Sequence, residues 1–104
     1  MSMVWDNHNK LLKKYTRQNF GDAFLFNIEY SSNKKTIGEI DAYGYINDEL
    51  YLIEYKQHDT RDGYKKAKKQ LKRHIKYAIP SGEIYHCIYM HNQGKYKELF
   101  SNKE

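Results

Sequence analysis

Two stretches of the chain have apolar residues at the spacing of an amphipathic α-helix. The first runs to about Gln18, and the second runs from about Arg61 to Ile79 and ends at the helix breakers Pro80-Ser81-Gly82. Each is preceded by residues that commonly cap a helix, which are Asp6 or Asn7 for the first and Asp59 or Thr60 for the second. The pattern therefore predicts one helix near the start of the chain and another in its second half.

Four other stretches are rich in β-branched and aromatic residues, and they lie at Ala23–Tyr30, Ile37–Ile46, Leu50–Gln57 and Glu83–His91. Asn47-Asp48 separates the second from the third and is a favourable hairpin turn. The last ten residues are compatible with a short strand or a helix. The expected order α-β-β-β-α-β indicates an α/β fold, with a small mixed β-sheet flanked by helices. The helix between the third and fourth strands allows a crossover connection.

Length and composition limit the class of protein. A chain of 104 residues has room for a single domain over residues 1–104. It has no apolar run near the roughly 20 residues of a membrane helix, and its start lacks the order of a signal peptide. Cys87 is the only cysteine, which excludes an internal disulfide. We expect a soluble protein of a reducing compartment, cytoplasmic and either nucleoid-associated or viral, with no membrane partner.

Positive charge is concentrated in one segment. Residues 61–76 contain eight basic residues and one acid, a net charge of +7, whereas the whole chain carries +5, so the remaining residues sum to −2. A local basic stripe favours a polyanionic partner such as nucleic acid, although a solvated lysine-rich helix is an equal alternative. The candidate phosphate contacts are Lys65, Lys69, Lys72, Arg73 and Lys76, with Lys10, Lys13, Lys14 and Arg17 as a second patch.

The Asn47-Asp48 turn predicts a register that gathers charged residues. A two-residue turn places Asp41 opposite Glu54 and Glu39 opposite Lys56, whereas a three-residue loop or a bulge would shift the pairing. Strand alternation puts these four residues on one face of the sheet. The opposite face then carries an apolar set suited to the core, namely Ile40, Ala42, Ile53 and Tyr55.

Directly opposed carboxylates destabilise a sheet unless a cation lies between them. Two such oxygen ligands, completed by waters and a phosphate oxygen, are typical of Mg²⁺ sites in proteins. Lys56 points the same way as Glu54 and can orient a water or stabilise charge on a phosphorus centre. The pattern therefore indicates metal-assisted phosphodiester hydrolysis beside a basic helix. The alternative is a solvated sheet face, with a cross-strand ion pair between Glu39 and Lys56.

The segments Gly38-Glu39-Ile40-Asp41 and Leu50-Tyr51-Leu52-Ile53-Glu54-Tyr55-Lys56, followed by a helix with Gln70, resemble the PD-(D/E)xK nuclease superfamily. Within it, the chain is most similar to the small archaeal-type Holliday junction resolvases, and the likeness spans about residues 6–91. The resemblance implies a restriction-endonuclease-like core in which Asp41, Glu54 and the Tyr55 carbonyl bind Mg²⁺, with Mn²⁺ as a substitute. It also implies that Lys56 assists the attacking water.

The sequence departs from the family pattern in two places. Many members have a glutamate on the first helix that reaches the site, and this helix has none. The residues that are candidates for its place are Asp6, His8, Asn9 and Glu39. The proline of the name-giving motif is also absent, because Ile40 precedes Asp41. Gln70 and His58 are possible auxiliary residues, Gln70 by its similarity to a helix glutamine of exonuclease-like members and His58 by strand alternation with Lys56.

These features predict an Mg²⁺-dependent endodeoxyribonuclease whose catalytic residues are Asp41, Glu54, Lys56 and Glu39. A domain of this size has little surface for reading sequence, so we expect structure-selective cleavage in DNA recombination or repair. A four-way junction substrate, with its approximate two-fold symmetry, predicts a homodimer. The main alternative is a non-catalytic nucleic-acid-binding module that uses the basic helix at residues 61–78. A third is a partner-binding protein whose lysine-rich helix is only solvated.

Overall fold

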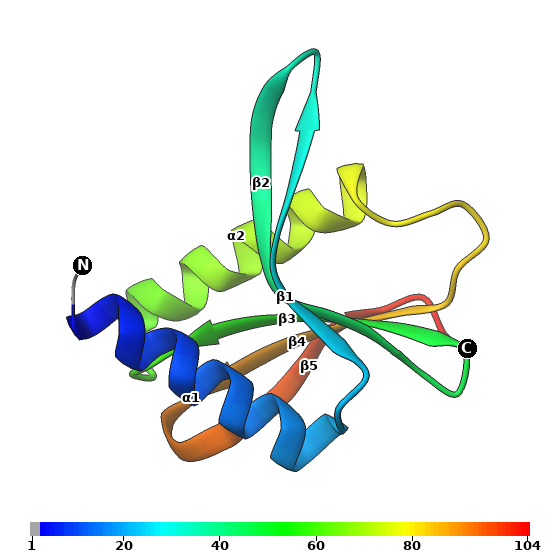
Figure 1. Cartoon of the computed structure of the whole chain (residues 1–104). Coiled ribbons are helices and arrows are strands. Elements are labelled where there is room, and N and C mark those ends of the chain that lie inside the picture. Colours follow the sequence, from blue (N-terminus) through cyan, green and yellow to red (C-terminus); the bar gives the residue numbers. More distant parts are fainter. Residues whose placement is uncertain (1–2) are drawn as a thin grey trace.

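The computed structural model describes residues 3–104, with side chains from Asn7 onward. Its elements are α1 (Met3–Phe20), β1 (Phe24–Ser32), β2 (Lys35–Ile46), β3 (Glu49–Lys56), α2 (Arg61–Tyr77), β4 (Tyr85–His91), a 3₁₀ turn η1 (Asn92–Gly94) and β5 (Lys95–Ser101) (Figure 1). The α/β class is confirmed, and the last ten residues contribute a fifth strand. α1 begins earlier than expected, so the predicted cap at Asp6 or Asn7 is wrong. Thr60 is the cap of α2, because its Oγ1 accepts the Gly63 N–H at 3.0 Å.

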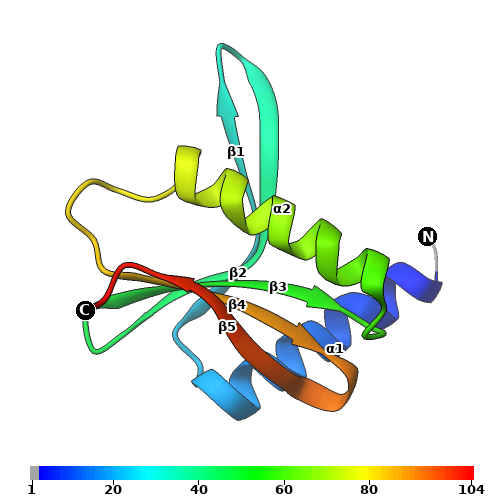
Figure 2. The same cartoon turned by 180° about the vertical axis from the view of Figure 1, so that it is seen from behind.

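The strands form one mixed sheet in the order β1-β2-β3-β4-β5. Only β3 and β4 are parallel, and α2 makes the connection between them. The two helices cover opposite faces of the sheet, as the front and back views show (Figures 1 and 2). β3 is central and lies between them, so its residues are buried on both faces.

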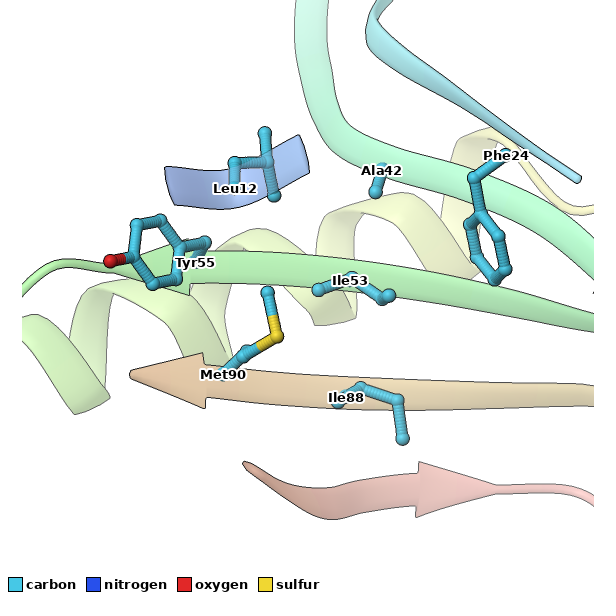
Figure 3. Close-up of a cluster of buried hydrophobic side chains, with 7 residues drawn as sticks. All are labelled: Leu12, Phe24, Ala42, Ile53, Tyr55, Ile88 and Met90. Carbon is cyan, nitrogen blue, oxygen red and sulfur yellow. The ribbon is translucent and has the colours of Figure 1, made fainter. Parts of the chain in front are cut away.

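Each helix covers its own hydrophobic cluster. On the α1 face, Leu12 meets side chains from four strands, which are Phe24, Ala42, Ile53, Tyr55, Ile88 and Met90 (Figure 3). On the α2 face, Leu71 meets Ile40, Leu50, Leu52 and Cys87. Complete burial of an aliphatic side chain contributes about 1.5–3 kcal/mol, so these two clusters supply much of the stability of the fold.

The hairpin turn between β2 and β3 has the predicted form. Asn47 and Asp48 have φ angles of 52° and 66°, as in a type I′ turn, and Ile46 pairs with Glu49. The pairing of β2 with β3 ends at Ala42 and Ile53. The predicted pairs Asp41–Glu54 and Glu39–Lys56 are therefore wrong as sheet pairs.

The outer half of β2 leaves the sheet and pairs with β1 alone. This two-stranded arm rises away from the other strands and passes beside α2 (Figure 1). Asn27 has a positive φ of 55° in β1, at the level of Asp41, and marks the bend. Because of the bend, Ile40 joins the α2-side cluster while Ala42 stays on the α1 side. The expectation that both lie on one core face with Ile53 and Tyr55 is wrong for Ile40.

Neither helix in the described part of the chain combines the length and the apolar character needed to cross a membrane.

Candidate metal and nucleic-acid site

Asp41 occupies the point where β2 and β3 separate. Its Oδ2 accepts the backbone N–H of Tyr55 at 2.8 Å, so the side chain replaces the backbone acceptor that a continued ladder would provide. This bond holds the carboxylate beside the last residues of β3. Asp41 and Glu54 are thus close together, as the sequence predicted, although the contact that brings them together is not a strand pair.

Glu54 lies on the α2 face of β3 and is buried, with 1% of its surface exposed. One of its carboxylate oxygens, Oε1, contacts the imidazole Nε2 of His74 on α2. The other ring nitrogen of His74, Nδ1, is 2.7 Å from the hydroxyl of Tyr30 on β1. A chain of polar groups therefore links three elements, from the half-buried Tyr30 through the buried His74 to the buried Glu54.

The protonation of this chain is shifted by burial. Burial raises the pKa of Glu54 well above its usual value, and the neighbouring Asp41 charge raises that pKa further, while Lys56 opposes the shift. Burial also lowers the pKa of His74 to about 4, helped by the adjacent Arg73. His74 is therefore uncharged at neutral pH and does not neutralise the carboxylates.

Glu39 belongs to the same electrostatic group. Its pKa is raised by burial, then by Asp41 and by Glu29, and the nearby His8 opposes these effects. Glu39 and Lys56 also act on the pKa of Glu54, in opposite directions. The structure thus brings together all four predicted catalytic residues, and among them the three carboxylates repel one another.

His8 is the first-helix residue that reaches this site. Its Nε2–H donates to the backbone carbonyl of Tyr55 at 3.1 Å, and the His8 and Tyr55 rings lie 5.2 Å apart. Of the other candidates, Asn9 accepts a hydrogen bond from Asn27 at 3.1 Å, and the side chain of Asp6 lies outside the described residues. Among these candidates on the first helix, His8 is therefore the one whose described side chain contacts the Tyr55 carbonyl.

The donor chemistry fits a hard divalent cation. Asp41, Glu54, Glu39 and the Tyr55 carbonyl all offer oxygen, which Mg²⁺ prefers. Among side chains from Asn7 onward, however, no three His, Cys, Asp or Glu residues are arranged to hold a metal ion as they stand. Three of these donors already have protein partners, since Glu54 contacts His74, the Tyr55 carbonyl accepts from His8, and Asp41 accepts the Tyr55 N–H.

The predicted phosphate contacts on α2 are all exposed, and they are Lys65, Lys69, Lys72, Arg73 and Lys76. Arg73 also donates from Nη1 to the Ile37 carbonyl of the arm at 3.3 Å. The second predicted set, Lys10, Lys13, Lys14 and Arg17, is exposed on α1. Lys13 and Arg17 lie over the Phe26 ring. Because α1 and α2 cover opposite faces, the two basic sets form separate surfaces.

The two auxiliary candidates lie in different surroundings. His58 is exposed beyond the end of β3, and with Gln57 it lines both of two adjoining hollows, of about 400 and 360 Å³. The smaller hollow also contains Lys56 and Lys66. Gln70 is half-buried on α2, and its Oε1 has no hydrogen-bond partner among the described residues.

Sequence reasoning missed His74 and Tyr30. His74 lies three residues after Leu71 and seven after Ala67, which is the spacing of the buried side of α2. That spacing was a usable signal for His74. No sequence signal identifies Tyr30, because its contact depends on the bend of the arm.

Comparison with protein-family models, curated proteins and solved structures finds no match to this chain. The geometry of the site and the charge of the surface around it are therefore the basis for assigning a function.

Proposed function

We propose that this protein is a metal-dependent DNA endonuclease that hydrolyses phosphodiester bonds. The observation that carries the proposal is the convergence of three carboxylates, Asp41, Glu54 and Glu39, with Lys56 beside the end of β3. The raised pKa values of Glu54 and Glu39 show that this gathering is costly to the folded protein, and such costs are typical of sites that bind a cation or catalyse a reaction.

Each residue of the site has a distinct role in this proposal. Asp41, Glu54 and the Tyr55 carbonyl hold Mg²⁺ or Mn²⁺, and Glu39 completes the acidic set. The cation supplies Lewis acidity toward the phosphate and lowers the pKa of a bound water. The Lys56 ammonium orients the attacking water and stabilises negative charge that develops on the phosphate oxygens. By resemblance to resolvase-like nucleases, the products carry 5′-phosphate ends.

The substrate is proposed to be branched DNA, including four-way junctions, bound by a homodimer. The exposed cations of α2 suit the phosphate backbone, which gives affinity without reading sequence. A two-fold symmetric junction would be cut at two equivalent positions by two copies of the site.

The test is cleavage of labelled duplex, single-stranded, flap and four-way junction DNA, with Mg²⁺, Mn²⁺ or EDTA. Wild type is compared with Asp41→Asn and Lys56→Ala, and with Glu49→Gln as the matched control on the same strand but at its far end. We expect metal-dependent cutting that both site variants lose and the control retains. Paired symmetric cuts in the junction alone would identify a resolvase. Absence of metal-dependent cutting on every substrate would contradict the proposal.

One observation favours a second candidate, a nucleic-acid-binding module without catalysis. His8 and His74 already occupy the Tyr55 carbonyl and the Glu54 carboxyl, and this arrangement satisfies them without a cation. Such a module would bind DNA equally well in EDTA and in Mg²⁺, and Asp41→Asn would not change the affinity. Fluorescence anisotropy with labelled duplex measures both.

A further inference from the structure

His74 and Tyr30, which form a chain of polar groups with Glu54, have no part in the reaction steps proposed above. We propose that His74 is a positioning residue that fixes the Glu54 carboxyl group for cation binding, and that Tyr30 fixes His74. This inference rests on the proposed function, because it assigns a purpose to His74 only if Glu54 binds a metal.

Glu54 is buried and has His74 as a hydrogen-bonding partner. Its side chain and that of His74 are each only 1% exposed, so water does not supply the hydrogen bonds that a carboxyl group needs. His74 contacts one oxygen of the carboxyl group, Oε1. In this proposal the other oxygen binds the cation that Asp41 shares. Metal-binding carboxylates are commonly held in this way by a second hydrogen-bonding group.

His74 is itself fixed at both ring nitrogens. Nε2 meets Glu54 and Nδ1 lies 2.7 Å from the Tyr30 hydroxyl, so a ring flip would break both contacts. The Tyr30 and His74 rings also meet edge to face, at 83° and 5.5 Å. When Glu54 is ionised, Nε2–H donates to the carboxylate and Nδ1 accepts from the Tyr30 hydroxyl.

Gly38 leaves space for the Tyr30 hydroxyl to contact His74. A Cβ atom at Gly38 would lie 2.2 Å from the Tyr30 oxygen, so a larger residue there would displace the hydroxyl. The arm is also tied to α2 by Arg73, which donates to the Ile37 carbonyl. The arm therefore holds Tyr30 against α2, and its position is coupled to that of Glu54.

The experiment measures Mn²⁺ binding by titration calorimetry and cleavage over a range of Mn²⁺ concentrations. His74→Leu removes both ring contacts in a similar volume, whereas His74→Gln keeps an N–H donor. Tyr30→Phe removes only the supporting hydroxyl. Tyr45→Phe is the matched control, because it also removes one bonded hydroxyl, which donates to Glu83 at 3.1 Å away from Glu54.

We expect His74→Leu to weaken Mn²⁺ binding by about 10–100-fold, the range typical of second-layer partners of a metal ligand. Saturating Mn²⁺ should restore most of its kcat, because the ligands and Lys56 remain. His74→Gln should recover most of the affinity, Tyr30→Phe should lose roughly 3–10-fold as the more remote partner, and Tyr45→Phe should match wild type. A merely structural His74 would lower the melting temperature in EDTA in all His74 variants without this order of metal affinities.

Wild-type Mn²⁺ affinity in a folded His74→Leu variant would overturn the inference and leave the nuclease proposal intact. If His74→Leu does not fold, wild-type affinity in both His74→Gln and Tyr30→Phe would overturn it, whereas a loss in Tyr30→Phe alone would support it. Failure of wild type to bind Mn²⁺ at all would overturn the proposed function and this inference together.

Discussion

Two histidine–carboxylate clusters lie near opposite ends of β3, and they differ in how their charges are balanced. The site cluster is Glu54, His74 and Tyr30 together with Asp41. The distal cluster is Glu49, His86, Glu98 and Lys103, in which the two ring nitrogens of His86 contact the two glutamates. Tyr51 stacks on the His86 ring, with 4.5 Å between ring centres.

In the distal cluster a cation meets the acid directly. Lys103 Nζ lies 2.7 Å from Glu49, and together with His86 it lowers the pKa of that carboxyl. In the site cluster burial and Asp41 act in the opposite direction and raise the pKa of Glu54. A balanced cluster stabilises the folded state, whereas an unbalanced one costs stability and is retained where a ligand restores the balance. The comparison therefore supports the proposed function at one end of β3 and favours a structural role for the cluster at the other end.

The largest difference is expected in catalysis. Glu54→Gln removes a proposed metal ligand and should reduce the rate of DNA cleavage by about 10³-fold or more, since such ligands act directly on the transition state. Glu49→Gln should change the rate by less than about threefold, because the proposal places neither DNA nor the metal at this residue. Single-turnover cleavage of a labelled junction measures both. Equal rates in the two variants would contradict the assignment.

The pH dependence of stability separates the two partners of the site cluster. The folded pKa of His74 lies near 4, below the usual value, so folding disfavours its protonated form and stability falls as the pH drops from about 6.5 to 4. The folded pKa of Glu54 is raised, so its contribution has the opposite sign, and stability is lost as the pH rises above about 4.5.

Each single variant removes one of the two titrating groups, so its stability should show the pH dependence of the group that remains. In Glu54→Gln, the free energy of unfolding should fall by about 3 kcal/mol between pH 6.5 and pH 4. The reason is that the pKa of His74 is about 4 in the folded protein and 6.5 outside it, and each pH unit between these values is worth about 1.36 kcal/mol. In His74→Gln, stability should instead increase as the pH falls toward 4.5. Urea unfolding at several pH values in EDTA measures both. Slopes of the same sign in the two variants would show that the pair is not held as described.

The sequence predicted the two helices and the first four strands well because each has a local signal. The Asn47-Asp48 turn is such a signal, and it correctly set the register at Ile46 and Glu49. The spacing of Ala67 and Leu71 likewise predicted the buried side of α2. These features depend on neighbouring residues, so no knowledge of the rest of the fold was needed.

The bend of the arm was not predictable in the same way. Strand alternation assumes a continuous ladder, and it placed Asp41 and Glu54 as a direct pair and Ile40 with Ala42. The positive φ of Asn27 and the bond from the Tyr55 N–H to Asp41 break that ladder, and both depend on contacts between distant segments. The gathering of the acids was predicted, whereas the role of His74 and Tyr30 follows only from the three-dimensional arrangement.

The two clusters should respond with opposite signs when one charge is removed. Asp41→Asn can keep the bond to the Tyr55 N–H while removing repulsion on Glu54, so metal-free stability should rise by about 1 kcal/mol. Glu49→Gln removes an acid that is paired with Lys103 and should lower the melting temperature. Thermal unfolding in EDTA at neutral pH checks the signs. Destabilisation by both variants would mean that Asp41 is a structural residue.

The smallest expected effect is on the salt dependence of DNA binding, and it compares exposed lysines of α2 with Lys103 of the distal cluster. Lys69 is exposed on α2, and the proposal assigns its charge to DNA phosphates, whereas the charge of Lys103 is used by Glu49. Lys69→Ala should lower the slope of log Kd against log salt by about one unit on duplex DNA, because one fewer counterion is released. Lys72→Ala should act similarly, although its ammonium also lies 5.9 Å from the centre of the Phe100 ring.

Lys103→Ala is the matched control, since it removes the same charge from the chain. It should leave the slope unchanged, because its cation belongs to the distal cluster and not to the proposed DNA-binding surface. Fluorescence anisotropy at several salt concentrations resolves a difference of one unit. If all three lysine variants lowered the slope equally, affinity would depend on net charge alone. The assignment of α2 as the DNA-binding face would then lose its support, because a specific face predicts that the position of a charge matters as well as its sign.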